Sequence, residues 1–158
     1  MSDELSIRIW IDGDACPVKD ETYKVALRYK LPVTLVANSW MRMPTHPLFS
    51  FKLVSDGFDA ADDFIAESVN GLSLVITSDI LLADRCLKAS ATVLAPNGKP
   101  FTDNSIGGAI ATRAIMADLR AGVGSENIGG PPPFSKADRS QFLQSLDREL
   151  QRLKKMRH

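Results

Sequence analysis

The chain has 158 residues, of which 44% are hydrophobic and 24% are charged, and this composition is typical of one globular domain with its own core. It has no apolar run near the roughly 20 residues of a membrane span, its first residues are too acidic and polar for a secretory signal, and its two cysteines are too few for a disulfide framework. We therefore expect a cytoplasmic protein with reduced thiols and no membrane partner.

The formal net charge of zero conceals an uneven distribution of charge. The segment from Lys136 to the end carries seven Lys or Arg against three acids, whereas seven acids lie between Asp56 and Asp84. An acidic site with a basic appendage is compatible with a metal-dependent enzyme that acts on a polyanion. A basic helix is also commonly no more than a solvated face.

Short apolar runs alternate with helical patterns along most of the chain. The first run, residues 7–11 (IRIWI), has the length and β-branched content of a buried strand. Similar signals predict further strands at 31–38, 48–54, 72–77 and 92–95, and helices at 18–29, 58–69, 80–89 and 106–120. Because strands alternate with helices, we predict an α/β fold with a central parallel sheet of about five strands flanked by helices.

Two segments follow this predicted α/β domain of residues 1–121. Residues 122–134 are rich in Gly and Pro, which is typical of a linker. Residues 135–158 are predicted to form a basic amphipathic helix, with Ser135 as the N-cap and Asp138 as the acid of a capping box. Its apolar stripe must pack on the same domain or on a second copy in a homodimer. The stripe consists of Phe142, Leu143, Leu146, Leu150 and Leu153.

Two acids, Asp12 and Asp14, directly follow the first predicted strand and are separated only by Gly13. Ligands of α/β proteins bind at the carboxyl ends of the strands, which is where these side chains are expected. One acid at such a turn can cap the next helix, which Pro17 is suited to begin. A cap requires one acid, however, and this turn has two.

Further acids occur where the second and third predicted helices begin. Helical periodicity places Asp59 and Asp62 beside the apolar face of the second helix and places Asp63 further toward solvent. Acids in a first helical turn also complement the helix dipole, which accounts for one or two of them. Asp79 follows the fourth predicted strand and is a natural N-cap of the next helix.

The acids that follow the first and fourth strands meet if these strands are neighbours at the switch point of a doubly wound sheet. Carboxylates packed together repel one another and raise their pKa values, and a divalent cation relieves this repulsion. Oxygen ligands without His or Cys favour Mg²⁺ or Mn²⁺ over zinc, and such an ion can activate water and polarise a phosphodiester. We therefore predict phosphodiester hydrolysis, with a metal at Asp12, Asp14, Asp59, Asp62 and Asp79, of which Asp12, Asp14, Asp59 and Asp79 are also expected to be catalytic.

The chain resembles the uncharacterised bacterial YaiI/YqxD family in the strings IDGDACPV, LVAN, GFDAAD, LVITSDILLA, VLAPNGKPFT and GGPPPFSKADRSQFLQSLD, which together run from about residue 7 to residue 150. That family is similar in fold to PIN-domain and NYN-type nucleases, and TSDILL matches their T-x-D-x-x-L pattern. The resemblance implies a PIN-like three-layer fold with acids at the carboxyl edge of the sheet. It implicates the same five aspartates in hydrolysis of RNA or other single-stranded nucleic acid, with activity inferred from fold and acids.

Two other enzyme mechanisms fit the sequence less well. Haloacid-dehalogenase-type phosphatases begin with the same D-x-D pattern that occurs at 12–14. They then need a Ser or Thr strand end, a Lys and a pair of acids in that order, whereas the acids 62–63 here precede Thr77. Cys16 is a poor nucleophile because neighbouring carboxylates raise the pKa of a thiol.

A non-catalytic module that binds nucleic acid or protein is the remaining alternative. Trp40 and Arg42, with Arg113 and Arg120 on the fourth predicted helix, are suited to stacking on bases and holding phosphates. Trp40 is equally suited to anchoring its loop, and Arg120 to complementing the helix dipole. The partner expected for the enzyme is nucleic acid, RNA above all, whereas the module leaves nucleic acid and protein both open.

Overall fold

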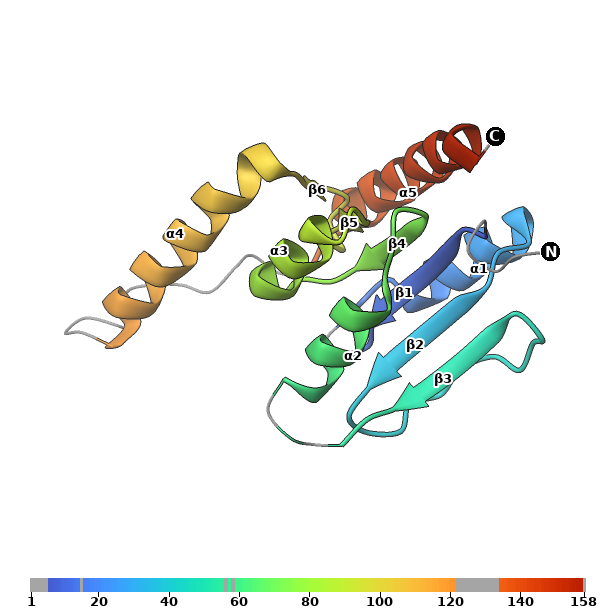
Figure 1. Cartoon of the computed structure of the whole chain (residues 1–158), viewed down its shortest axis with the longest axis horizontal. Helices are drawn as coiled ribbons and strands as arrows, with labels where there is room; N and C mark the ends of the chain where they lie inside the picture. Colours follow the sequence, from blue (N-terminus) through green and yellow to red (C-terminus); the bar gives the residue numbers. More distant parts are fainter. Residues whose placement is uncertain (1–5, 15, 56, 58, 122–133, 158) are drawn as a thin grey trace.

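The computed structural model describes residues 6–14, 16–55, 57, 59–121 and 134–157. Within them a six-stranded sheet forms the centre, in the order β3-β2-β1-β4-β5-β6 (Figure 1). The strands are β1 (Arg8–Asp12), β2 (Val33–Ala37), β3 (Phe49–Leu53), β4 (Ser73–Ile76), β5 (Thr92–Leu94) and β6 (Pro100–Phe101). The first five are parallel, which confirms the predicted α/β class.

Strand β6 pairs antiparallel with β5 and adds to the expected five strands. It has only two residues, one of them Pro100, and it lies at the edge of the sheet. A run this short has no alternation that could indicate a strand. Proline is tolerated at this position because an edge strand has a side without hydrogen-bonded neighbours.

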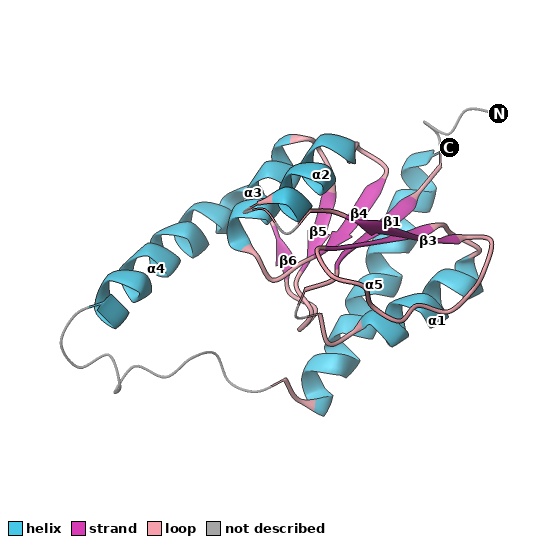
Figure 2. Ribbon diagram, turned by 90° about the horizontal axis from the view of Figure 1, so that it is seen from below, coloured by secondary structure: helices cyan, strands magenta, loops and turns pink. Residues whose placement is uncertain are grey.

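In the described residues, five helices cover the two faces of the sheet (Figure 2). Helices α1 (Lys19–Tyr29) and α5 (Lys136–Arg157) cover one face, and α2 (Ala60–Ser68), α3 (Ile80–Lys88) and the start of α4 (Asp103–Ala121) cover the other. Helix α4 begins three residues before the expected start, where the Ser105 N–H donates to Thr102 Oγ1 at 3.2 Å. None of these helices is long and apolar enough to cross a membrane.

Side chains of alternate strand residues build two cores, one on each face of the sheet. On β1, Ile9 and Ile11 pack toward α1 and α5, whereas Trp10 packs toward α2 and α3. Strand β2 is buried along its whole length. Parallel strands covered on both faces are apolar throughout, which is why short apolar runs located them correctly.

Helix α5 packs on the sheet of its own chain. Its residues Phe142, Leu146, Leu150 and Leu153 are fully buried in the core beneath α1, so this stripe is occupied within one copy. The helix begins with the expected capping box, since the Ser135 N–H donates to Asp138 Oδ2 and the Asp138 N–H donates to Ser135 Oγ, both at 3.1 Å. Residues 122–133 of the predicted linker lie outside the described residues.

Replacing Gly98 by alanine should destabilise the protein by about 2–4 kcal/mol. Gly98 has a φ of +89°, and a Cβ there would lie 2.6 Å from the backbone of Gln141 in α5. Urea unfolding of Gly98→Ala measures the loss. The matched control is Gly71→Ala, because a Cβ at Gly71 has nothing within 4 Å. Equal stability of the two variants would contradict the close packing of α5 on this turn.

Candidate active site

The carboxyl ends of β1 and β4 are joined by a partly buried hydrogen bond. Thr77, which follows β4 and is 1% exposed, donates from Oγ1 to Asp12 Oδ2 at 2.8 Å. The same hydroxyl oxygen accepts from the Asp79 N–H at 2.9 Å. The backbone N–H of Asp14 also donates to the Asp12 carboxylate. Asp12 is therefore held in one orientation at the switch point of the sheet.

Asp79 has the predicted capping role and a second contact. Its Oδ1 accepts from the N–H groups of Leu81 and Leu82 at 2.9 and 3.2 Å, which caps α3. The Asp79 carboxylate also lies close to Asp62, in the first turn of α2, since its charge is the second-largest cause of the raised pKa of Asp62. Capping alone therefore does not account for the position of Asp79.

Asp12, Asp62 and Asp79 form an acidic cluster whose members repel one another. Burial, which is the largest cause, and the charges of Asp79 and Asp12 together raise the pKa of Asp62 to about 7. Burial likewise raises the pKa of Asp12 to about 6, with contributions from the charges of Asp14 and Asp79, against the lowering effect of the Thr77 hydrogen bond. Shifts of this kind, caused by burial and by like charges, are typical of functional sites.

Asp14 and Asp59 lie at the margin of the acidic cluster. The charge of Asp14 acts on Asp12, and the charge of Asp59 acts on Asp62. Asp59 precedes α2 with a left-handed φ of 67° and makes no side-chain cap there. Asp63 points elsewhere and pairs with Arg85 at 2.7 Å on the surface. The structure thus brings Asp12, Asp62 and Asp79 together and leaves the other two expected ligands beside them.

Two residues of this site were not among the expected site residues. The position of Thr77 between the end of a strand and an acid could have identified it from the sequence. The acceptor of its hydroxyl, Asp12, is however 65 positions away. Gly13 is required by packing, because a Cβ there would lie 2.9 Å from Leu35 Cδ1 and 3.0 Å from the Val36 carbonyl oxygen. The turn between Asp12 and Asp14 therefore passes directly over β2.

The donor chemistry of the acidic cluster fits a hard divalent cation, because all its ligand atoms would be carboxylate oxygens. In the described part of the chain, no three His, Cys, Asp or Glu side chains are assembled to hold a metal ion as they stand. The pKa of Asp62, raised by burial and by the charges of Asp79 and Asp12, means that this carboxyl group holds its proton more tightly than an ordinary aspartate. A cation bound at the cluster would therefore displace this proton.

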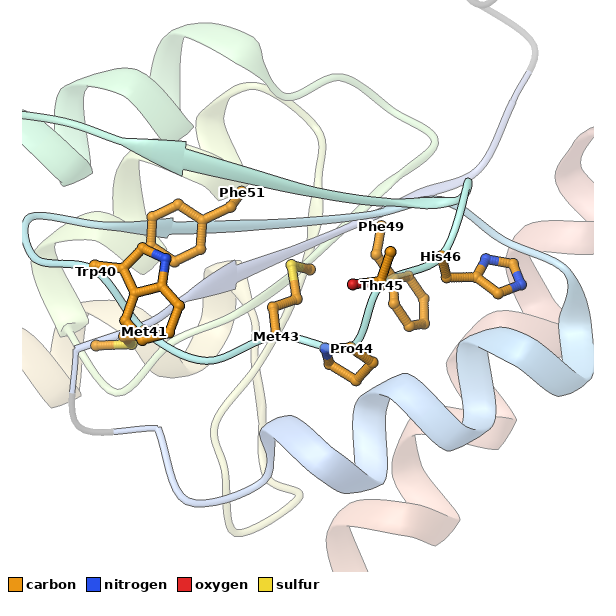
Figure 3. A pocket seen from close by; sticks show the side chains of 8 residues that line it. All are labelled: Trp40, Met41, Met43, Pro44, Thr45, His46, Phe49 and Phe51. Atoms are coloured by element: carbon orange, nitrogen blue, oxygen red, sulfur yellow. The ribbon is translucent and has the colours of Figure 1, made fainter.

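The expected nucleic-acid contacts are divided between the two faces of the sheet. Trp40, on the loop after β2, is 75% exposed and borders a cavity of about 280 Å³ (Figure 3). Arg42, on the same loop, borders a neighbouring cavity with Asp20. Arg113 is exposed on α4, which packs on the opposite face of the sheet. The side chain of Arg120 lies outside the described residues. The first cavity is lined by Trp40, Met41, Met43, Pro44, Thr45, His46, Phe49 and Phe51.

Both cysteines are buried, and burial raises the pKa of each thiol, that of Cys86 to about 12. Raised thiol pKa values oppose formation of the thiolate, which is the nucleophile. The Nδ1 atom of His46 accepts from the Leu48 N–H at 3.0 Å and so shapes the loop before β3. The environment of Cys16 thus agrees with the expectation that it is a poor nucleophile.

Comparison with known proteins identifies relatives over nearly the whole chain. A family model described as "Uncharacterized BCR, YaiI/YqxD family" matches residues 10–152. A UPF0178 protein of Sphingopyxis alaskensis is 67% identical over 93% of this chain and 95% of its own length. UPF0178 proteins of Jannaschia sp. and Rhodopseudomonas palustris are 58% and 54% identical, over 92% and 99% of this chain and 94% and 98% of their own lengths. No solved structure matches, so the likeness to PIN-domain folds stays a prediction.

Replacing Asp62 by asparagine should stabilise the protein above pH 7. Because the folded-state pKa of Asp62 is raised to about 7 from 3.8, the folded state holds a proton that the unfolded state has lost between these values. Stability therefore falls as pH rises through this window, and the full penalty is present above it. Asp62→Asn should recover about 1 kcal/mol at pH 8, allowing for solvent screening.

The gain should disappear toward pH 4, where both states of the wild-type residue are protonated. Thermal unfolding of both proteins from pH 4 to pH 8 measures it. The matched control is Asp63→Asn, which lies on the same helix as Asp62, removes only an exposed ion pair with Arg85 of α3 and should change stability little at any pH. An Asp62→Asn variant that is less stable than wild type at pH 8 would contradict the repulsion.

Proposed function

We propose that this chain, which belongs to the uncharacterised YaiI/YqxD family, hydrolyses phosphodiester bonds of single-stranded nucleic acid, RNA above all, with Mg²⁺ or Mn²⁺ at the acidic cluster. The observation that carries the proposal is the mutual repulsion of Asp12, Asp62 and Asp79 at the carboxyl edge of the sheet. A cap for α3 requires one carboxyl group, and the end of a strand requires none. Three carboxyl groups that repel one another therefore favour a role beyond structure.

The chain's own residues would prepare the site in two ways. The Thr77 hydroxyl holds one oxygen of Asp12, and the amides of α3 hold one oxygen of Asp79, so that both carboxylates are oriented. Asp62, whose pKa is raised to about 7, would give up its proton when a cation binds. A bound Mg²⁺ or Mn²⁺ ion would lower the pKa of a coordinated water and polarise the phosphodiester. Asp14 and Asp59 stand beside the cluster and would extend its oxygen donors.

The loop after β2 supports a nucleic-acid substrate. It leaves the sheet at the same carboxyl edge as Asp12, since Asp12 pairs with Val36 near the end of β2. Trp40 offers an exposed indole on which an unstacked base can lie, and Arg42 offers a cation for a phosphate. Bases of a duplex are already stacked, so this chemistry favours single strands.

One observation favours a second function, a nucleic-acid-binding module without turnover. The described residues hold no assembled group of three metal ligands, and a module would need none. In that case the acidic cluster would have only a structural role at the carboxyl ends of the strands. The two functions differ in whether cleavage depends on Asp12.

Cleavage of labelled single-stranded RNA in Mn²⁺ should fall at least about 100-fold in Asp12→Asn and should stop on addition of EDTA. Asn keeps the shape of Asp12 but removes its negative charge. Asp63→Asn is the control and should cleave like wild type, because Asp63 pairs with Arg85 outside the cluster. Binding of the RNA without cleavage, unchanged by Asp12→Asn, would support the module instead.

Mn²⁺ alone should stabilise the wild-type protein by about 2.7 kcal/mol when it is present at 100 times its Kd. For a chain of this size the stabilisation corresponds to an increase of roughly 5–10 °C in Tm. Differential scanning fluorimetry measures the shift without any substrate. Asp12→Asn and Asp62→Asn should each abolish most of it, and Asp63→Asn should retain it. A wild-type Tm that does not respond to millimolar Mn²⁺ would contradict a cation site.

A further inference from the structure

Helix α4 is attached to the body only by its first turns. Ile106 is buried, and Ile110 packs against the core between the sheet and α3. From residue 111 to residue 119 every side chain is exposed except Met116, which is partly buried. Both views show the helix extending away from the sheet (Figures 1 and 2). Its second half is therefore a helical surface that the described part of the chain does not cover.

The exposed side of α4 carries an uncharged stripe, which we call the α4 stripe: Gly108, Thr112, Ile115 and Leu119. Ile115 and Leu119 are 59% and 48% exposed. The spacing of four, three and four residues places all four within about 60° of the helix circumference, on the side opposite Ile106 and Ile110. Such spacing is that of a seam between two packed helices.

The two adjacent glycines of α4 point to the same conclusion independently. Glycine in the interior of a helix lowers helix stability relative to alanine, so it usually serves a close contact. A Cβ at Gly107 or at Gly108 would meet nothing within 4 Å. Nothing in the described residues therefore explains why these positions lack side chains. A second helix that approaches the α4 stripe closely would explain it.

We propose that the α4 stripe is the interface of a homodimer, in which it packs antiparallel against the α4 stripe of a second copy. About one two-fold axis, Leu119 of each copy would lie over Gly108 of the other, and Thr112 would lie beside Ile115. A single axis satisfies both pairs because the positions are symmetric about the midpoint of the stripe. The large side chain of Leu119 thus packs against Gly108, which has no side chain.

The charges of the chain favour a second copy as the occupant. The α4 stripe contains no charged residue, and Arg113 and Asp118 lie outside it. The formal net charge is zero, so two copies do not repel one another at long range. Antiparallel helices also place opposite ends of their dipoles together. One helix pair is a smaller contact than a standard interface of roughly 1,200–2,000 Å², so the dimer should depend on concentration.

Sedimentation velocity of the full chain from low micromolar to near-millimolar concentration tests this interface. The mass of the wild type should rise from 17.3 kDa toward twice that value. Gly108→Leu should weaken self-association at least about tenfold, because its new side chain would occupy the place of the partner's Leu119. Ala114→Leu adds the same side chain to an exposed position outside the stripe and should dimerise like wild type.

The swap Gly108→Leu with Leu119→Ala should restore the dimer, since each large side chain again faces a small one. Far-UV circular dichroism and Tm should show that Gly108→Leu folds, because the added side chain has open space in the monomer. A wild type that stays monomeric at every concentration overturns the proposal, as does a Gly108→Leu variant that dimerises normally. A swap that stays monomeric overturns the antiparallel register.

Discussion

Strand β1 pairs with β2 on one side and with β4 on the other, and the position of every acid in the site depends on this placement. After β3, at one edge of the sheet, the chain passes over β2 and β1 to form β4. Strands β1 and β4, which are far apart in the sequence, therefore become neighbours. The hydrogen bond from Thr77 to Asp12 then joins their carboxyl ends across 65 positions of sequence. Helices α2 and α3 begin at the same edge and deliver Asp62 and Asp79 to it.

The acidic cluster is held in place by parts of the protein that contain no charge. Ile9, Ile11 and Leu35, on β1 and its neighbour β2, are fully buried, and this burial supplies stability that offsets carboxylate repulsion. Thr77 and the amides of α3 orient two of the carboxylates, whereas the described residues give the side chain of Asp62 no such hydrogen-bond donor. The site therefore combines two oriented carboxylates with a third whose pKa is raised by burial and by their charges.

The two long helices after the sheet each carry a stripe of uncharged residues but have different surroundings. Helix α5 is buried along its stripe against β5 and the core under α1. Helix α4 contacts α3 only near its start and exposes Ile115 and Leu119. Periodicity shows that each helix has an apolar side, but it does not show which surface that side meets. That choice depends on how the helix leaves the sheet, which is set by the edge strand β6 and the turn around Gly98.

The sequence by itself determined the features that depend on local interactions. Apolar runs located five parallel strands, and capping chemistry identified Asp79 and the Ser135–Asp138 box, because strand burial and helix caps involve residues close in sequence. Only the tertiary structure decided that Asp62 rather than Asp14 or Asp59 completes the acidic cluster, that Thr77 orients Asp12, and that the stripe of α5 is covered while that of α4 is exposed. These outcomes depend on contacts between residues far apart in the chain, and packing rather than local pattern sets such contacts.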